Sequence, residues 1–206
     1  VEADVVLDNG ETFKIADDVY FTGFARSKNP PVIDGNVGDD EWDKDVLFRL
    51  QYESQVKSIP DWTGPLDVGG KVYSQWDNDN LYIAAEIDDD VHFATDEAKR
   101  IWYVDSIQIA VTAKKEKTAI RTEFGFGELN GELAMERYSF MGVDTDITGW
   151  TDKQNFKDKV KLAVKRDEEK KKTYYEISIP WEELYGEKIK PASRDSLYFS
   201  MLVNDN

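Results

Sequence analysis

The chain has no cysteine and a single histidine among its 206 residues. It therefore has no disulfides, no thiol nucleophile and no cysteine-ligated zinc or iron–sulfur site. A Ser-His-Asp triad would depend entirely on His92, and no serine occupies the glycine-flanked turn that presents such a nucleophile. Gly125, Gly127 and Gly131 miss the spacing of a dinucleotide-binding loop. These shortages argue against most kinds of catalytic machinery.

Positive charge is also scarce, because 26 Lys and Arg residues stand against 42 Asp and Glu residues, for a formal net charge of −16. Such a surface repels phosphate backbones and anionic lipids, so we expect no nucleic acid and no membrane as partners. No apolar run is long enough to cross a membrane. Neutral ligands and cations remain. A glycoside-cleaving carboxylate pair stays open as an alternative, although no pair stands out among so many acidic residues.

Helical periodicity is rare, and apolar residues mostly alternate with polar ones. In residues 104–112, for example, Ile107, Ile109 and Val111 share one face, and Ser106, Gln108 and Ala110 share the other. The predicted strands are residues 12–15, 19–25, 47–52, 68–75, 81–87, 104–112, 119–126, 132–140, 157–165, 173–179 and 197–203. Only residues 39–43 and 181–185 look helical, each over about one turn. The pattern predicts an all-β fold, an immunoglobulin-like or jelly-roll-like antiparallel β-sandwich with long loops and one or two short helical turns.

Residues 1–29 are weakly patterned, and we expect them to form an N-terminal lead-in or an extra edge strand. The predicted sandwich domain is residues 30–206, starting at Pro30 and Pro31. Trp42, Trp76 and Trp181 lie in or beside apolar patterns, so they are predicted core residues.

Aspartates cluster where two predicted strands meet. Asp88, Asp89 and Asp90 follow one strand, and Asp105 lies at the start of the next. The loop between them can bring both strand ends together, and calcium takes six to eight oxygen ligands. The sequence therefore predicts a structural calcium site at these four residues, with a solvated acidic loop as the alternative.

An ordered set of short motifs between residue 31 and the end of the chain resembles family 9 carbohydrate-binding modules. The matching segments are Val32-Ile33-Asp34-Gly35, Asp40-Glu41-Trp42, Trp76-Asp77, Asn80-Leu81-Tyr82-Ile83, Trp102, Asp105-Ser106-Ile107, Tyr175-Glu176, Ile179-Pro180-Trp181 and Val203-Asn204-Asp205. The wider group of DOMON-like sandwiches also includes haem-binding domains, so the resemblance is stronger for the fold than for the ligand.

The resemblance implies a non-catalytic module that carries calcium, with Asp89 and Asp105 as the best-matching ligands. It implies binding of a neutral plant-type polysaccharide, xylan or glucan, or its chain ends, and covalent attachment to a secreted, extracellular glycoside hydrolase. In the family the sugar lies between two tryptophans, of which Trp102 matches the first. Gln108 falls where the family has a Glu, and Arg121 matches an Arg on the next strand. The second tryptophan follows the final Asn-Asp segment, so the C-terminal end is expected to be truncated here.

Two further tryptophans are candidate sugar platforms. Trp62 and Trp150 lie in the long polar loops 53–70 and 142–155, where sandwich proteins often bind ligands. Two other functions stay open. A haem-binding electron-transfer domain would need an axial ligand from a Lys or from His92, Met135, Met141 or Met201. A ligand-free spacer module would need no site.

Overall fold

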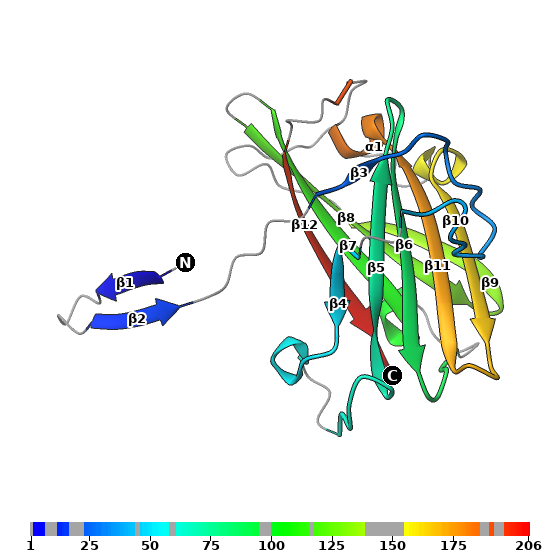
Figure 1. The fold of residues 1–206 in the computed structure, drawn as a ribbon, viewed down its shortest axis with the longest axis horizontal. Coiled ribbons are helices and arrows are strands. Elements are labelled where there is room, and N and C mark those ends of the chain that lie inside the picture. Colours follow the sequence, from blue (N-terminus) through cyan, green and yellow to red (C-terminus); the bar gives the residue numbers. More distant parts are fainter. Residues whose placement is uncertain are drawn as a thin grey trace.

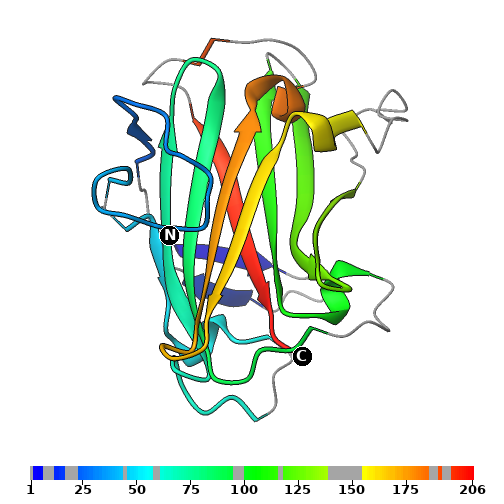
Figure 2. The ribbon, with the colours of Figure 1, turned by 90° about the vertical axis from the view of Figure 1, so that its right-hand side faces the viewer.

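The computed structural model describes residues 2–6, 12–16, 23–43, 46–57, 61–94, 100–115, 118–138, 155–185, 190–191 and 196–206. In these ranges, two sheets stack face to face (Figures 1 and 2). A separate two-stranded sheet is formed by β1 (Glu2–Val6) and β2 (Thr12–Ala16). No helix in the described ranges is long and apolar enough to span a membrane.

The first large sheet has six strands in the order β10-β11-β6-β5-β3, with β4 also paired to β5. Its strands are β3 (Ala25–Arg26), β4 (Phe48–Leu50), β5 (Val68–Trp76), β6 (Asn80–Asp89), β10 (Lys161–Asp167) and β11 (Lys172–Pro180). The short β3–β5 pair is parallel and the other ladders are antiparallel. This is the six-stranded sheet.

The second large sheet has four antiparallel strands in the order β12-β7-β8-β9. They are β7 (Ser106–Lys115), β8 (Thr118–Leu129), β9 (Glu132–Tyr138) and β12 (Leu197–Asn204). The short helices are η1 (Glu53–Gln55), η2 (Ile101–Tyr103), η3 (Asn155–Asp158) and α1 (Trp181–Tyr185). The predicted all-β sandwich is confirmed. Residues 39–43, predicted to be helical, instead form a turn in which the Glu41 and Trp42 N–H groups both donate to the Gly38 carbonyl.

The core lies between the two sheets and follows the alternation seen in the sequence. Ile107, Ile109 and Val111 of β7 are buried, as are Phe124 and Phe126 of β8. They pack against inward side chains of β6 and β11 and against Trp76 and Trp181, which are 8% and 5% exposed. Since successive strand residues point to opposite faces, Gln108 lies on the outer face of the four-stranded sheet.

A second apolar cluster covers the outer face of the six-stranded sheet. Trp42, 2% exposed, packs there with Tyr73, Tyr82 and Ala84. Glu176 has no exposed surface, and its carboxylate accepts hydrogen bonds from the Trp42 indole (2.7 Å) and from the backbone N–H groups of residues 34 and 35 (2.9 and 2.7 Å). A buried carboxylate is tolerated when donors surround it. Glu176 therefore fastens the N-terminal part of the domain to the sheet.

Two tight turns set the strand registers. The Asp77 carboxylate accepts the N–H groups of Asp79 and Asn80, both at 2.8 Å, and the Tyr82 hydroxyl at 2.7 Å, which closes the β5–β6 hairpin. The β8–β9 hairpin turns through Asn130 and Gly131, which have φ values of 56° and 73°. Asn and Gly are the residues that such a two-residue turn favours.

Candidate functional site

Trp102 lies in η2, directly before β7, and is half-buried. Its neighbours Ile101 and Val104 are fully buried, and the Ser106 hydroxyl lies 2.7 Å and 3.0 Å from their respective carbonyl oxygens. These contacts fix η2 against the start of β7. The Arg100 guanidinium lies 5.1 Å from the centre of the Trp102 ring, a cation–π distance. The indole is thus held in place with part of its surface open to solvent.

Arg100 also faces Glu136 of β9, with 3.9 Å between the Arg100 Nη1 and Glu136 Oε2 atoms. The Glu136 Oε2 atom is buried, and it accepts no hydrogen bond from any part of the chain that the structure describes. The Arg100 guanidinium offsets the charge of this carboxylate, and the Glu136 side chain as a whole is 24% exposed, so a ligand beside Trp102 can reach part of it. The sequence analysis did not identify this pair. The available signal was that Glu136 directly follows the core residue Met135 in a predicted strand and so lies on the opposite, outer face.

Gln108, Gly125 and Glu136 lie in one row across the outer face of the four-stranded sheet. The register pairs Gln108 of β7 with Gly125 of β8, and Gly125 with Glu136 of β9. On the other side, Gln108 pairs with Leu202 of β12. Gly125 has no side chain, so the backbone of β8 is uncovered between the Gln108 amide on one side and the Glu136 carboxylate on the other. This arrangement can receive the hydroxyl groups of a small ring beside the Trp102 indole.

The register does not place Arg121 opposite Gln108. Arg121 pairs with Thr112, which lies four residues beyond Gln108 on β7, or about 13 Å along the strand. By register, positions 108 and 121 belong to the same face of the sheet but to different cross-strand rows. The Arg121 side chain is outside the described part of the structure. The tight β7–β8 connection, with Lys115 paired to Thr118, fixes this offset.

Trp62 lies away from this row, at the β12 side of the sheet. It is half-buried, and its indole N–H donates to the Val68 carbonyl at 3.0 Å. It lines a pocket of about 80 Å³ with Leu202 and Tyr52. Trp150, the other predicted platform, falls outside the described residues.

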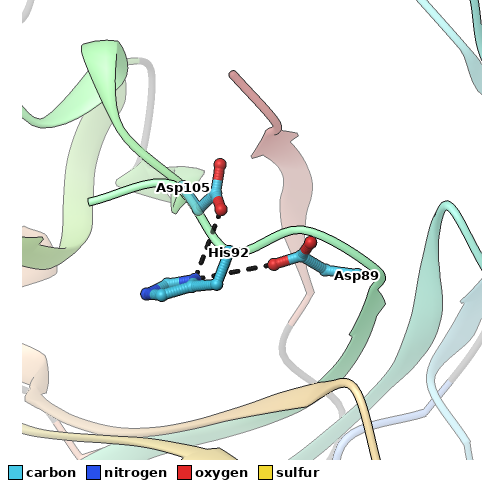
Figure 3. A group of neighbouring side chains, drawn as sticks. All are labelled: Asp89, His92 and Asp105. Atoms are coloured by element: carbon cyan, nitrogen blue, oxygen red, sulfur yellow. Dashed lines mark ion pairs between the residues drawn. The ribbon is translucent and has the colours of Figure 1, made fainter. Parts of the chain in front are cut away.

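Asp89, His92 and Asp105 form a tight group at the end of the sandwich near the C-terminus (Figure 3). The His92 Nδ1 atom lies 3.2 Å from Asp105 Oδ2 and 3.5 Å from Asp89 Oδ2. Both carboxylates are buried, at 4% and 6% exposure. Arg166 of β10 adds a second cation, with its Nη1 atom 3.1 Å from Asp89 Oδ2. The sequence motif of adjacent aspartates thus leads to a charged group that also contains a histidine and an arginine.

Each carboxylate oxygen in this group already accepts a hydrogen bond. The Val91 N–H donates to Asp89 Oδ1 at 3.0 Å, the Asn206 N–H donates to Asp105 Oδ1 at 3.1 Å, and the Phe93 N–H donates to Asp105 Oδ2. A carboxylate oxygen has two acceptor positions. Each Oδ2 atom also faces His92, and Asp89 Oδ2 faces Arg166, so within the described residues it is the two Oδ1 atoms that keep a position for a proton or a cation.

Electrostatic coupling shifts the pKa values in the group. Hydrogen bonds to Asp105 and Asp89 outweigh burial and raise the pKa of His92 to about 9. Burial opposes ionisation of Asp89, but the hydrogen bond from His92 and the charge of Arg166 hold its pKa below the ordinary value. Burial and the charges of Asp105 and Asp89 raise the pKa of Asp205 to about 6. The group therefore combines two buried carboxylates with a protonated histidine and an arginine, and Asp205 adds a third carboxyl group beside them.

Asp88 and Asp90, also predicted as calcium ligands, lie outside this group. Asp88 follows the opposite face of β6 and pairs with Lys172, whose Nζ atom is 3.0 Å from Asp88 Oδ1. Asp90 is exposed, and its backbone N–H donates to the Asp67 carbonyl. Strand alternation separates Asp88 from Asp89 although the two are adjacent in sequence.

The residues proposed as haem ligands are engaged elsewhere. Met135 and Met201 pack against the core, and His92 is held between two carboxylates. Met141 lies outside the described residues. The described geometry thus offers no support for the haem alternative.

Residues 33–206 match the family described as "Carbohydrate family 9 binding domain-like". The chain belongs to this family. Its members are binding domains and not enzymes. Two solved structures of a family 9 module from Caldicellulosiruptor kristjanssonii share the fold. The glucose complex has 18% identity and a TM-score of 0.52, covering 89% of this chain and 78% of that chain. The cellotriose complex has 17% identity and a TM-score of 0.50, covering 88% and 76%.

A curated relative of this family 9 domain is the endo-1,4-beta-xylanase A of Thermotoga neapolitana. It is 27% identical over 175 residues, which cover 85% of this chain. The match spans only 14% of the length of that relative.

Proposed function

We propose that this family 9 domain binds a neutral plant-type polysaccharide, xylan or glucan, or its chain ends, on the outer face of the four-stranded sheet. The observation that carries the proposal is the half-open Trp102 indole beside the Arg100–Glu136 ion pair, in which the Glu136 side chain is 24% exposed. A pyranose ring has an apolar C–H face and a polar rim. Trp102 covers the face, while Glu136 and Gln108 accept or donate hydrogen bonds at the rim.

The strength of binding follows from the surface that one indole covers. Burying about 150–250 Å² of aromatic surface at about 25 cal/mol/Å² gives roughly 4–6 kcal/mol. Losing the free motion of the sugar costs at least about 4 kcal/mol, while hydrogen bonds to Glu136 and Gln108 add some energy back. We expect dissociation constants between about 1 μM and 1 mM. The net charge of −16 favours neutral over anionic polysaccharides.

The test is calorimetric titration with soluble xylan and glucan oligosaccharides. Trp102→Ala should remove detectable binding and leave the melting temperature within a few degrees, because Trp102 is outside the core. Tyr198→Ala is the matched control, since Tyr198 is 76% exposed at the far end of β12. Lack of binding by the unaltered domain to any neutral glycan at millimolar concentration would leave a ligand-free spacer as the better account.

We further propose that the domain is tethered to a secreted polysaccharide-degrading enzyme and acts outside the cell. The similarity to part of a xylanase from Thermotoga neapolitana supports this proposal. Tethering converts a weak sugar contact into a high local concentration of enzyme on its substrate, so modest affinity is sufficient.

We also propose that Asp89 and Asp105 hold a structural calcium ion. Their buried oxygens suit calcium, and the Oδ1 atom of each keeps an acceptor position within the described contacts. Burial raises the pKa of Asp205, and the charges of Asp105 and Asp89 raise it further, so a cation bound there would interact with three neighbouring carboxyl groups. His92 offers nitrogen, not the oxygen that calcium prefers, so we assign the binding to the carboxylates, with backbone and water oxygens completing the shell. Calcium there would tie the start of β7 to the end of β6.

A further inference from the structure

The pocket beside β12 has features of a second sugar subsite. Its lining combines two aromatic side chains, Tyr52 and Trp62, with Leu202 and the polar residues Gln51 and Lys57. Tyr52 is 59% exposed and Leu202 is 46% exposed, so part of this apolar surface faces solvent. Exposed aromatic surface next to polar side chains suits a ligand that has both an apolar face and a polar rim.

The backbone at Tyr52 is held by a local hydrogen-bond network. The Gln55 Oε1 atom accepts the backbone N–H groups of Gln51 and Tyr52, both at 2.9 Å, and its Nε2 atom donates to the Arg49 carbonyl at 2.8 Å. Trp62 is fixed in turn by its hydrogen bond to the Val68 carbonyl. An indole that is fixed before a ligand arrives loses less conformational entropy when the ligand binds.

The pocket adjoins the row that contains Gln108 and Glu136. Leu202 lines the pocket and is the register partner of Gln108, and the row continues through Gly125 to Glu136. From Leu202 to Glu136 is three strand spacings, or about 14 Å. An oligosaccharide of a few rings can bridge that span across the sheet.

We propose that the pocket of Tyr52 and Trp62 is a second subsite, which binds a further pyranose ring of the same neutral chain that binds Trp102. This inference rests on the proposed function and extends it. The domain then binds a segment of several rings across β8, β7 and β12. Chain length becomes a determinant of affinity.

The experiment compares a disaccharide with a hexasaccharide, in both the cello and xylo series, by calorimetric titration. The unaltered domain should bind the hexasaccharide more tightly. Tyr52→Ala should lower the affinity for the hexasaccharide roughly tenfold and leave that for the disaccharide unchanged. Tyr198→Ala, which removes an exposed tyrosine from β12 outside the pocket, should change neither affinity.

Two results would overturn the second subsite while leaving the proposed function intact. One is equal affinity of the unaltered domain for the two lengths, with both lost in Trp102→Ala. The other is a Tyr52→Ala variant that binds the hexasaccharide as tightly as the unaltered domain. Failure of the unaltered domain to bind either length would instead contradict the proposed function, and the subsite with it.

Discussion

At the scale of single residues, the sequence indicated which aromatic side chains are buried but not which polar groups meet them. The apolar surroundings of Trp42, Trp76 and Trp181 predicted their burial, and the structure confirms it. The contact between Trp42 and Glu176 spans 134 residues of chain, and no local pattern encodes it. The same limit hid Arg100 and Glu136, because an outward-facing Glu looks like any solvated charge until its neighbours are known.

The residue-scale prediction concerns Glu176. Glu176→Gln replaces one acceptor oxygen with an amide donor that faces backbone or indole N–H donors in a fully buried position. We expect the free energy of unfolding to fall by about 2–4 kcal/mol in urea denaturation. Glu168→Gln is the control, because the Glu168 side chain is 62% exposed and its ion pairs lie at the surface. Equal losses in the two variants would show that Glu176 has no special role.

At the scale of elements, strand alternation and register decide which predicted site residues meet. The sequence predicted β6 and β7 closely, but it grouped Asp88 with Asp89, which point to opposite faces of β6. The resemblance assigned Gln108 and Arg121, on neighbouring strands, to one sugar site, and the register of the β7–β8 hairpin places these two positions four residues apart along the strands. The position of a residue along a strand predicts on which face of the sheet its side chain lies. Cross-strand neighbours depend on turn geometry, which the sequence specifies less directly.

The element-scale prediction uses this alternation to test the calcium proposal. Calcium should raise the melting temperature of the unaltered domain, and a chelator should reverse the increase, because an ion that binds only the folded state would join the end of β6 to the start of β7 through Asp89 and Asp105. Asp88→Asn should keep this response, since Asp88 pairs with Lys172 on the other face. Asp89→Asn should lose it. Melting curves that do not respond to calcium or chelator in the unaltered domain would refute the structural ion.

At the scale of the whole molecule, the outer faces of the two sheets differ in whether another segment of the chain covers them. Trp42 and the segment around it cover the outer face of the six-stranded sheet. On the four-stranded sheet, the outer face presents half-buried Gln108 and Glu136 beside Trp102. The alternating pattern predicted a sandwich, but it could not show which outer face is covered, because that depends on where a segment without regular structure packs. We propose that the uncovered outer face of the four-stranded sheet is the one that binds sugar.

The most direct test of that claim is an NMR titration of the isotope-labelled domain with a neutral cello- or xylo-oligosaccharide. The account predicts progressive shifts of the Trp102 indole N–H and of the backbone amides of Gln108, Gly125 and Glu136. The amides of Tyr73 and Ala84, on the covered face of the six-stranded sheet, should stay in place. Saturable shifts confined to that sheet, with Trp102 and Gln108 unchanged, would contradict the account.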